Sequence, residues 1–384
     1  MTEPVLVIGA GPAGLAAAAE LGRRGVPAEI IERSDAIAAA WRLRYDRLRL
    51  NTCRWHSRLS GERFPEGTPI FPDRDEFVRY LESYVERHDL LVRFGVQVDR
   101  IDRRGDGLRL TTSAGDLTAR HVIVATGHQH TPLMPDWPGL RQYRGRLLHS
   151  AEYRNSRQFR GADVLVAGAG NSAMDIACDL ALGGAARVRV SVRSQPHVLM
   201  RSSGPLPSDL LAMVLFPLPT TLSDRVVRLV RRWTVGDLAP WGLTIPREGM
   251  FTRMRRTGQT PTLMDATVIE AIRTRRFEIV ADVSSVTADG VRLADGTTLR
   301  PDAIVAATGF GTGLEPMVGH LGVLDDRGLP LASGGPAVAP GLRFSGYVPN
   351  IRHQYRDACS VAEQVSREVG TTGPVSLEQA ASTV

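Results

Sequence analysis

Two glycine-rich segments, about 160 residues apart, have the composition and spacing of a phosphate-binding turn. The first is VLVIGAGPAGLA at 5–16, and the second is VLVAGAGNSAMD at 164–175. Each begins with apolar residues, passes through glycines and continues into a helix-forming run. Such a sequence can present backbone N–H groups and a helix N-terminus to the diphosphate of a dinucleotide. The sequence therefore predicts two dinucleotide sites in one chain.

The first segment has all three glycines of the fingerprint. Gly9 permits a tight turn, Gly11 lets a diphosphate approach the backbone, and Gly14 allows close packing of the helix on the strand. Glu32 lies eighteen residues after Gly14, at the end of the next predicted strand. A carboxylate there accepts hydrogen bonds from an adenosine ribose and repels a 2′-phosphate. This site is therefore expected to bind FAD or NAD.

The second segment keeps Gly168 and Gly170 but has Ser172 and Ala173 in place of the later glycine. Arg193, followed by Ser194, is expected at the end of the second strand, where the first copy has Glu32. A cation there favours the 2′-phosphate of NADP, and the alternative is a surface arginine without a ligand. An NADPH that delivers a hydride to a flavin would explain two different sites in one chain.

The elements around each turn repeat one plan. In the first copy we expect a strand at 4–8, a helix at 12–22 that stops at Gly25, a strand at 27–33, a helix at 75–88, a hairpin at 108–119 and a buried strand at 121–127. In the second copy we expect a strand at 163–168, a helix at 171–182, a strand at 187–193, a hairpin at 290–299 and a strand at 302–310. The last strand of each copy ends in Ala-Thr-Gly. The repeat predicts an α/β fold with two Rossmann-like dinucleotide-binding domains.

Composition narrows the class of protein. The chain of 384 residues is 43% hydrophobic, which suits two cores, and we find neither a signal peptide nor an apolar run that spans a bilayer. Its three cysteines are far apart, so we expect neither disulfides nor a thiol redox centre, and a cytoplasmic location. There is no lysine, which excludes an internal Schiff base, and the arginines are too dispersed to indicate nucleic-acid binding. His128 and His130 have no further spaced ligand, so no metal is expected.

The segment around 222–233 and the tail from 371 onward lie outside the repeated plan. Leu222, Val226, Leu229 and Trp233 form a helical stripe backed by arginines, which favours a surface helix. The alternatives are contact with a membrane surface or a cap over the substrate. The tail from 371 onward is expected to be loose.

The segment YRGRLLHSAEYR at 143–154 decides between flavoprotein chemistries. Its form is aromatic-x-Gly-xxx-His-xxx-Tyr, through Tyr143, Gly145, His149 and Tyr153. It resembles the signature of class B flavin monooxygenases, with Tyr143 in place of the usual Phe. The segments 37–50, 71–87, 190–199 and 258–265 are most similar to the YUCCA branch of that family, which acts on indole-3-pyruvate. Ala39 and Ala40 stand before Trp41, where the family often has Gly-Gly.

The resemblance implies that the NADPH domain, residues 156–297, is inserted into an FAD domain made of residues 1–155 and 298–384. NADPH reduces FAD, O₂ forms a flavin C4a-(hydro)peroxide, and one oxygen atom passes to a small organic substrate. The transfer would be N- or S-oxygenation or oxidative decarboxylation of an α-keto acid. The alternatives are a Baeyer–Villiger enzyme, which usually has Trp-Pro where this chain has Tyr153-Arg154, an NADPH:quinone reductase and a non-catalytic nucleotide sensor.

The resemblance also assigns residues. Asn51 is expected to donate a hydrogen bond beside the flavin, with a loop-capping role as the alternative. His149 is expected to be structural, and Asn171 and Ser172 to contact the NADP diphosphate. The full set of expected cofactor contacts is Gly9, Ala10, Gly11, Pro12, Ala13, Gly14, Glu32, Arg33, Ala40, Trp41, Thr52, Val98, Ala125, Gly168, Ala169, Gly170, Asn171, Ser172, Ala173, Arg193, Ser194 and Gly309.

Overall fold

A computed structural model describes the chain except residues 1–3, 60–61, 204–205, 259–261, 349 and 371–384. The predicted loose tail lies outside the described residues. The chain forms two compact units. Unit 1 contains residues 1–42, 54–131 and 310–384, and unit 2 contains residues 43–53 and 132–309. Within the described ranges, no helix is both long and apolar enough to cross a membrane.

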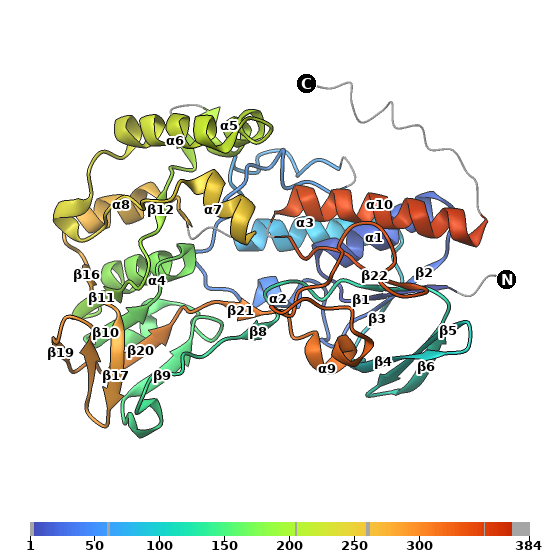
Figure 1. Cartoon of the computed structure of the whole chain (residues 1–384), viewed down its shortest axis with the longest axis horizontal. Coiled ribbons are helices and arrows are strands. Elements are labelled where there is room, and N and C mark those ends of the chain that lie inside the picture. The colour runs from blue at the N-terminus through green and yellow to red at the C-terminus, as the bar shows by residue number, and fades with distance from the viewer. Residues whose placement is uncertain (1–3, 60–61, 204–205, 259–261, 349, 371–384) are drawn as a thin grey trace. The chain divides into compact units, whose positions relative to one another are not determined.

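Unit 1 is built around a parallel five-stranded sheet. Its strands lie in the order β22 (Leu342–Phe344), β7 (Val122–Val124), β1 (Val5–Ile8), β2 (Ala28–Ile31) and β3 (Val92–Arg93). The helices α1 (Pro12–Arg23) and α10 (Ile351–Val369) lie together on one side of this sheet (Figure 1). Three antiparallel strands pack on the other side: β4 (Val98–Arg104), β5 (Gly107–Thr112) and β6 (Gly115–Ala119).

Unit 1 contains three further α-helices in the described residues. They are α2 (Ala39–Arg42), α3 (Arg74–Arg87) and α9 (Glu315–Val318). The predicted amphipathic helix at 75–88 is confirmed as α3, which begins at a complete capping box between Asp73 and Glu76. The predicted stop of the first helix is also confirmed, because Gly25 follows the C-cap of α1 with a φ of 71°.

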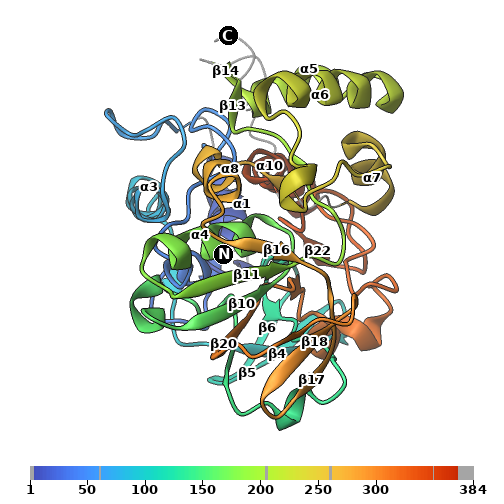
Figure 2. The ribbon, with the colours of Figure 1, turned by 90° about the vertical axis from the view of Figure 1, so that its left-hand side faces the viewer.

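Unit 2 repeats this architecture. Its parallel sheet has the order β16 (Glu278–Val280), β11 (Arg187–Ser191), β10 (Asp163–Ala167), β20 (Ala303–Ala306) and β9 (Arg146–His149). Helix α4 (Asn171–Leu182) covers one face of the sheet, and α8 (Ala266–Arg273) packs against α4 (Figure 2). The strands β17 (Val283–Thr287), β18 (Gly290–Leu293) and β19 (Thr298–Leu299) pack on the other face.

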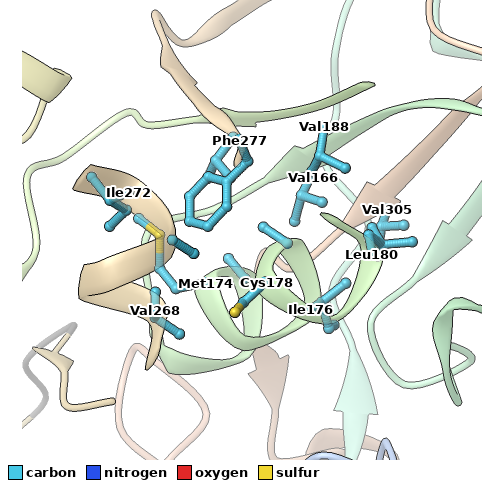
Figure 3. Packing of buried hydrophobic residues seen from close by; sticks show 14 of the residues in the cluster. Val166, Met174, Ile176, Cys178, Leu180, Val188, Val268, Ile272, Phe277 and Val305 are labelled. Carbon is cyan, nitrogen blue, oxygen red and sulfur yellow. The ribbon is translucent and has the colours of Figure 1, made fainter. Parts of the chain in front are cut away.

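The largest core of unit 2 lies between α4 and the sheet. Met174, Ile176 and Leu180 of the helix meet Val166 and Val305 of the strands, and Phe277 closes the cluster from the segment before β16 (Figure 3). Each of these side chains is almost completely buried, and burying one stabilises the fold by roughly 1.5–3 kcal/mol. Because α4 is held along its length, its N-terminus has a fixed position relative to the glycine turn.

A set of small elements follows β11 in unit 2. These are β12 (His197–Val198), β13 (Ser202–Ser203), β14 (Leu206–Pro207), α5 (Ser208–Leu215), α6 (Thr220–Thr234), α7 (Met250–Thr257) and β15 (Thr262–Leu263). The predicted surface helix is confirmed as α6, on which Leu222, Leu229 and Trp233 are exposed, but its arginines are not all solvated, because Arg231 lies on the buried face.

The bounds of the two units differ from the expected domain limits at 155/156 and 297/298. The main reason is the signature segment, which is part of the sheet of unit 2. It contributes β9, which pairs in parallel with β20, from Arg146 opposite Ala303 to His149 opposite Ala306. The segment from 132 to 155 therefore belongs to the core of unit 2.

The close packing of α1 on β1 explains why glycine is needed at position 14, and substitutions in α1 can test this explanation. A Cβ added at Gly14 would lie 1.9 Å from the carbonyl oxygen of Gly9, whereas one added at Gly22 of the same helix has nothing within 4 Å. We expect Gly14→Ala to lower the free energy of unfolding by about 1–3 kcal/mol, because the helix must move off the strand. Urea unfolding followed by circular dichroism measures this.

Gly22→Ala is the matched control. It should stabilise the protein by about 0.5–1 kcal/mol, since alanine loses less backbone entropy in a helix than glycine. Equal effects of the two substitutions would show that the close contact at Gly14 does not restrict the turn.

Candidate functional site

The first glycine turn is closed on one side and open on the other. Gly9 has a φ of +106°, and a Cβ there would lie 2.8 Å from the carbonyl oxygen of Ala125. Only glycine accepts this conformation and contact without strain. A Cβ at Gly11 meets nothing within 4 Å. The space beside Gly11 is thus the part of the turn that a ligand can approach.

The N-terminus of α1 is available to an anion. Gly11 is its N-cap and offers no side-chain acceptor, and Pro12 occupies the first turn. In contrast, Asp73 caps α3 through its carboxylate. Uncapped N–H groups at a helix start, together with the helix dipole, favour a phosphate. These features fit the diphosphate of FAD, with Ala13 and Gly14 in the same first turn.

The Glu32 carboxylate is held in place by the backbone. It accepts hydrogen bonds from the N–H of Ala10 at 2.8 Å and of Ser34 at 2.9 Å. Each carboxylate oxygen keeps a further lone pair, so Glu32 can still accept a hydrogen bond from a ribose hydroxyl. The structure thus brings Glu32 to the glycine turn, as expected, while Arg33 beside it is exposed.

The loop before α2 is attached to the same turn. Ala38 has a φ of 53° and donates its N–H to the carbonyl oxygen of Ala10 at 2.9 Å. Trp41 meets Phe77 edge-on, with ring centroids 4.6 Å apart, and Ala40 is exposed. The left-handed conformation that glycine would favour therefore falls on Ala38, ahead of the Ala39-Ala40 pair.

Val98, another expected cofactor contact, lies in β4. Its side chain is buried in the apolar cluster between β4 and the sheet. Any contact of Val98 with a cofactor would therefore come from its backbone, and its assignment stays a prediction.

The second glycine turn has the same construction in unit 2. Gly168 has a φ of +141°, and a Cβ there would lie 2.4 Å from the carbonyl oxygen of Ala307. A Cβ at Gly170 meets nothing within 4 Å, and Gly170 starts α4 without a side-chain cap. Asn171 and Ser172 are half-buried in the first turn, after Ala169. Ala173, at the position of Gly14, has a completely buried methyl group.

The hydrogen-bond register corrects the expected position of Arg193. The Gly9 N–H donates to the Ile31 carbonyl oxygen at 2.8 Å, and the Gly168 N–H donates to that of Ser191 at 3.0 Å. The residue that matches Glu32 is therefore Val192, and Arg193 lies one residue further. Arg193 and Ser194 are exposed, and no described residue pairs with the Arg193 guanidinium.

The signature segment is held by hydrogen bonds within unit 2. The Tyr143 hydroxyl donates to the carbonyl oxygen of Pro301 at 2.6 Å. The tyrosine ring lies over Gly145, where a Cβ would be 2.4 Å from the Tyr143 hydroxyl oxygen. The Tyr153 hydroxyl donates to the Asp179 carboxylate of α4 at 2.6 Å. The aromatic, glycine and tyrosine positions thus attach β9 to its neighbours.

His149 connects β9 to the second Ala-Thr-Gly turn. Its Nδ1 accepts a hydrogen bond from the N–H of Ala151 at 3.1 Å, so the ring proton lies on Nε2, which donates to the Gly309 carbonyl oxygen at 3.0 Å. The ring is buried, and burial lowers its pKa. A neutral imidazole with both ring nitrogens hydrogen-bonded fits a structural role for His149, and that role stays a prediction.

Asn51 belongs to unit 2 and joins a polar network there. Its side-chain oxygen accepts a long hydrogen bond, 3.4 Å, from Nε of Arg201. Arg201 also donates to Asp265 at 2.6 Å, and Asp265 caps α8 through the N–H of Thr267. The amide nitrogen of Asn51 has no partner among the described residues and is free to donate. Thr52 beside it is half-buried.

Sequence reasoning missed the contribution of Arg201, Asp265 and a buried pair nearby. The Tyr45 hydroxyl donates to the Asp175 carboxylate at 2.9 Å, and both residues are almost completely buried. Burial raises the pKa of Asp175 to about 6, although Arg201 opposes the shift. An acid among apolar residues in VLVAGAGNSAMD was the signal that could have found it.

The raised pKa of Asp175 gives stability a specific pH dependence. Below about pH 4 the carboxyl is protonated in both the folded and the unfolded chain. As pH rises through 6, the buried group must ionise, which costs the folded state about 3 kcal/mol for a shift of roughly two pKa units. We expect Asp175→Asn to unfold like the wild type near pH 4 and to be the more stable protein at pH 7.5, as measured by urea midpoints.

Tyr45→Phe is the control. It removes the hydrogen bond that lowers the pKa of Asp175 but keeps the carboxyl, so its stability should fall more steeply than that of the wild type as pH rises. A difference between Asp175→Asn and wild type that does not change with pH would contradict the raised pKa.

The family model and the relatives that match this chain are all oxidoreductases. The family described as pyridine nucleotide-disulphide oxidoreductase matches residues 6–204. The indole-3-pyruvate monooxygenase YUCCA1 of Oryza sativa subsp. japonica is 38% identical over 327 residues, which make up 84% of this chain and 80% of the relative. The probable indole-3-pyruvate monooxygenase YUCCA9 of Arabidopsis thaliana is 36% identical over 334 residues, 85% and 79% of the two chains.

Solved structures show the same fold. A flavin-containing monooxygenase from Stenotrophomonas maltophilia matches with a TM-score of 0.73 at 24% identity, over 95% of this chain and 98% of that one. Cys53, Cys178 and Cys359 are all free, and burial raises the pKa of Cys178 to about 11. The identity of 38% to YUCCA1 over 84% of this chain, taken with the two glycine turns, shows the family. The chain belongs to the FAD- and NADPH-dependent class B flavin monooxygenases, in their YUCCA-like branch.

Proposed function

We propose that the enzyme uses NADPH and O₂ to convert a small organic α-keto acid into the carboxylic acid that is one carbon shorter. The balanced reaction consumes the keto acid, O₂, NADPH and a proton, and it yields the acid, CO₂, NADP⁺ and water. One oxygen atom of O₂ enters the acid and the other enters water. The observation that carries the proposal is the pair of unlike glycine turns, which suits one flavin and one NADPH, together with relatives named for indole-3-pyruvate.

Unit 1 would hold FAD. The open side of Gly11 and the uncapped start of α1 would receive the diphosphate, and Glu32 would receive the ribose hydroxyls. The carbonyl oxygen of Ala125 lies against Gly9 of the turn, and Trp41 lies in α2, directly after Ala38, which is hydrogen-bonded to the turn. The bound flavin supplies the redox and oxygen chemistry, and the protein supplies binding, orientation and exclusion of water.

Unit 2 would hold NADPH. Gly170, Asn171 and Ser172 start α4 and would receive the diphosphate. The exposed and unpaired Arg193 would receive the 2′-phosphate, with Ser194 beside it. The shift of Arg193 by one residue relative to Glu32 does not weaken this role, because a long side chain reaches a phosphate at the mouth of the turn.

Asn51 would orient an oxygen atom during the transfer. Arg201 binds the side-chain oxygen of Asn51, so the amide nitrogen is the end that can donate a hydrogen bond. Such a positioned donor stabilises charge that develops on a reacting oxygen. Asn51 is therefore the proposed catalytic residue.

A second candidate is N- or S-oxygenation of a small nucleophile. It uses the same cofactors and the same sites, so the residues described above favour neither substrate. The names of the relatives favour the keto acid. Baeyer–Villiger oxidation is less favoured, because the likeness to cyclohexanone monooxygenase, at 19% identity, shows the fold alone.

Substitution of Arg193 tests the NADPH site. We expect Arg193→Ala to raise the KM for NADPH on the order of tenfold to a hundredfold. A change of this size corresponds to the loss of the charge-assisted hydrogen bonds between one arginine and the 2′-phosphate. The KM for NADH should change little, because NADH has no 2′-phosphate. Steady-state oxidation of each coenzyme by the FAD-loaded enzyme measures both values.

Arg187→Ala is the matched control for Arg193. Arg187 is an exposed arginine of the preceding strand, where it pairs with Glu278 at 3.0 Å. Its removal should leave both KM values unchanged. An equal rise for NADPH and NADH in Arg193→Ala would reject the assignment to the 2′-phosphate.

The proposed reaction can be followed with labelled oxygen. With indole-3-pyruvate, NADPH and ¹⁸O₂, we expect one ¹⁸O atom in each indole-3-acetate formed, as measured by mass spectrometry. Asn51→Ala should keep NADPH oxidation but divert most of it to hydrogen peroxide, because the positioned donor is lost. Asn51→Asp, which keeps the size of the side chain, separates loss of the donor from loss of packing.

Other outcomes point to other reactions. Unlabelled product would reject oxygen transfer. Turnover of quinones without oxygen, and no labelled product from keto acids, thioethers or amines, would identify a reductase. A preparation without bound flavin and without NADPH turnover would identify a nucleotide sensor.

We also propose that the enzyme works in the cytoplasm. Its three cysteines form no disulfide, which suits a reducing compartment. Its partners would be O₂ and the small organic substrate.

A further inference from the structure

Unit 2 contains a small pocket that the glycine turn and the Asn51 network do not use. It lies between the buried face of α6, strand β12 and the segment that leads into α7. The pocket has room for a small ion or for the head group of a larger molecule, but not for a dinucleotide. Two nitrogen-bearing side chains in its wall, Arg231 and His197, are more than nine-tenths buried.

Arg231 is a buried cation without a counter-ion. Its side chain comes from α6 and is 6% exposed. No residue in the described ranges forms an ion pair or a side-chain hydrogen bond with its guanidinium, and its Nε is completely buried without a partner. Asp237, which is exposed, acts on it only from beyond ion-pair distance. A guanidinium stays protonated in proteins, and its buried Nε leaves one N–H donor that a bound anion could satisfy.

His197 also has a buried nitrogen without a hydrogen-bond partner. It is 7% exposed, and its Nε2 has no partner among the described residues. Burial, and next to it the charge of Arg253, lower the pKa of His197, although Asp224 and Glu248 oppose this shift. A neutral imidazole still offers one N–H donor to a bound ligand.

The acids in the wall of the pocket do not neutralise Arg231. Asp224 accepts hydrogen bonds from the Phe251 N–H at 2.7 Å and from the Thr252 hydroxyl at 2.6 Å, which caps α7. Glu248 forms an ion pair with Arg256 at 2.8 Å. Neither carboxylate forms an ion pair with Arg231, and Arg228 adds a further positive charge to the wall.

We propose that this pocket binds the carboxylate group of a small organic acid, with Arg231 and His197 as its donors. A planar carboxylate fits the fork of a guanidinium. Val198, Val227, Ile245 and Pro246 complete the wall. These apolar groups suit the carbon chain behind a carboxylate better than they suit a hydrated phosphate. The inference does not rest on the proposed reaction, since it concerns binding alone.

The test is thermal unfolding of the FAD-loaded enzyme in a buffer free of carboxylates. Added sodium acetate or phenylacetate should raise the Tm of the wild type by about 2 °C or more, in a saturating manner, whereas sodium chloride and phosphate at equal ionic strength should not. Arg231→Met should unfold at a higher Tm than the wild type without acetate, because it removes an uncompensated buried charge, and should not respond to acetate.

Arg232→Met is the matched control, since Arg232 is exposed on the same helix and is not part of the pocket wall. It should keep the wild-type response to acetate. If Arg231→Met fails to fold, ¹⁵N-histidine NMR of the wild type replaces it: acetate should raise the pKa of His197 and shift its Nε2 resonance.

Three results would overturn the proposal. They are an equal acetate response in Arg231→Met and wild type, a lower Tm of Arg231→Met without acetate, and a stronger response to phosphate than to acetate. With indole-3-pyruvate as substrate, a higher KM in Arg231→Met would identify the substrate's own carboxylate as the ligand. An unchanged KM alongside the acetate response would identify a separate acid, and both results support a carboxylate site.

Discussion

The close approach of a backbone carbonyl to the first glycine of each turn is the constraint on which both cofactor sites depend. Ala125 blocks the space at Gly9, and Ala307 blocks the space at Gly168, in the same way in the two units. Each contact places the strand that ends in Ala-Thr-Gly against the strand that starts the turn. The helix that follows is then directed so that its uncapped N-terminus faces open space. The two sites are thus one geometrical solution used twice, and they differ in the side chains around the nucleotide.

The class B signature has a physical explanation in this fold. Its aromatic ring covers its glycine, and its histidine and second tyrosine form hydrogen bonds to Gly309 and to α4. Together these contacts hold an edge strand on the sheet of unit 2 and support the second Ala-Thr-Gly turn. His149 and Tyr153 of the signature thus attach β9 to the second Ala-Thr-Gly turn and to α4.

Buried charge marks where unit 2 departs from a simple dinucleotide domain. Asp175 and Tyr45, and Arg201 and Asp265, place polar groups in an apolar setting beside the start of α4, and each has a partner there. Arg231 has none in the described part of the chain. A paired buried charge rigidifies the site, whereas a buried donor without a partner favours a ligand that can accept its hydrogen bond. This difference is why the pocket at Arg231, rather than the Asp175 pair, points to a further binding site.

The sequence by itself determined the two turns, the elements that flank them and the contrast between Glu32 and Arg193, because short-range periodicity and glycine spacing encode these features locally. It also determined the family, through the signature at 143–154. Only the tertiary structure decided that the signature is a strand of unit 2, that Arg193 lies one residue past the place of Glu32, and that α10 packs on α1. It alone revealed the partners of Asp175 and the lack of one for Arg231. These features depend on contacts between segments far apart in the chain, and no local pattern of residue types specifies which distant groups will meet.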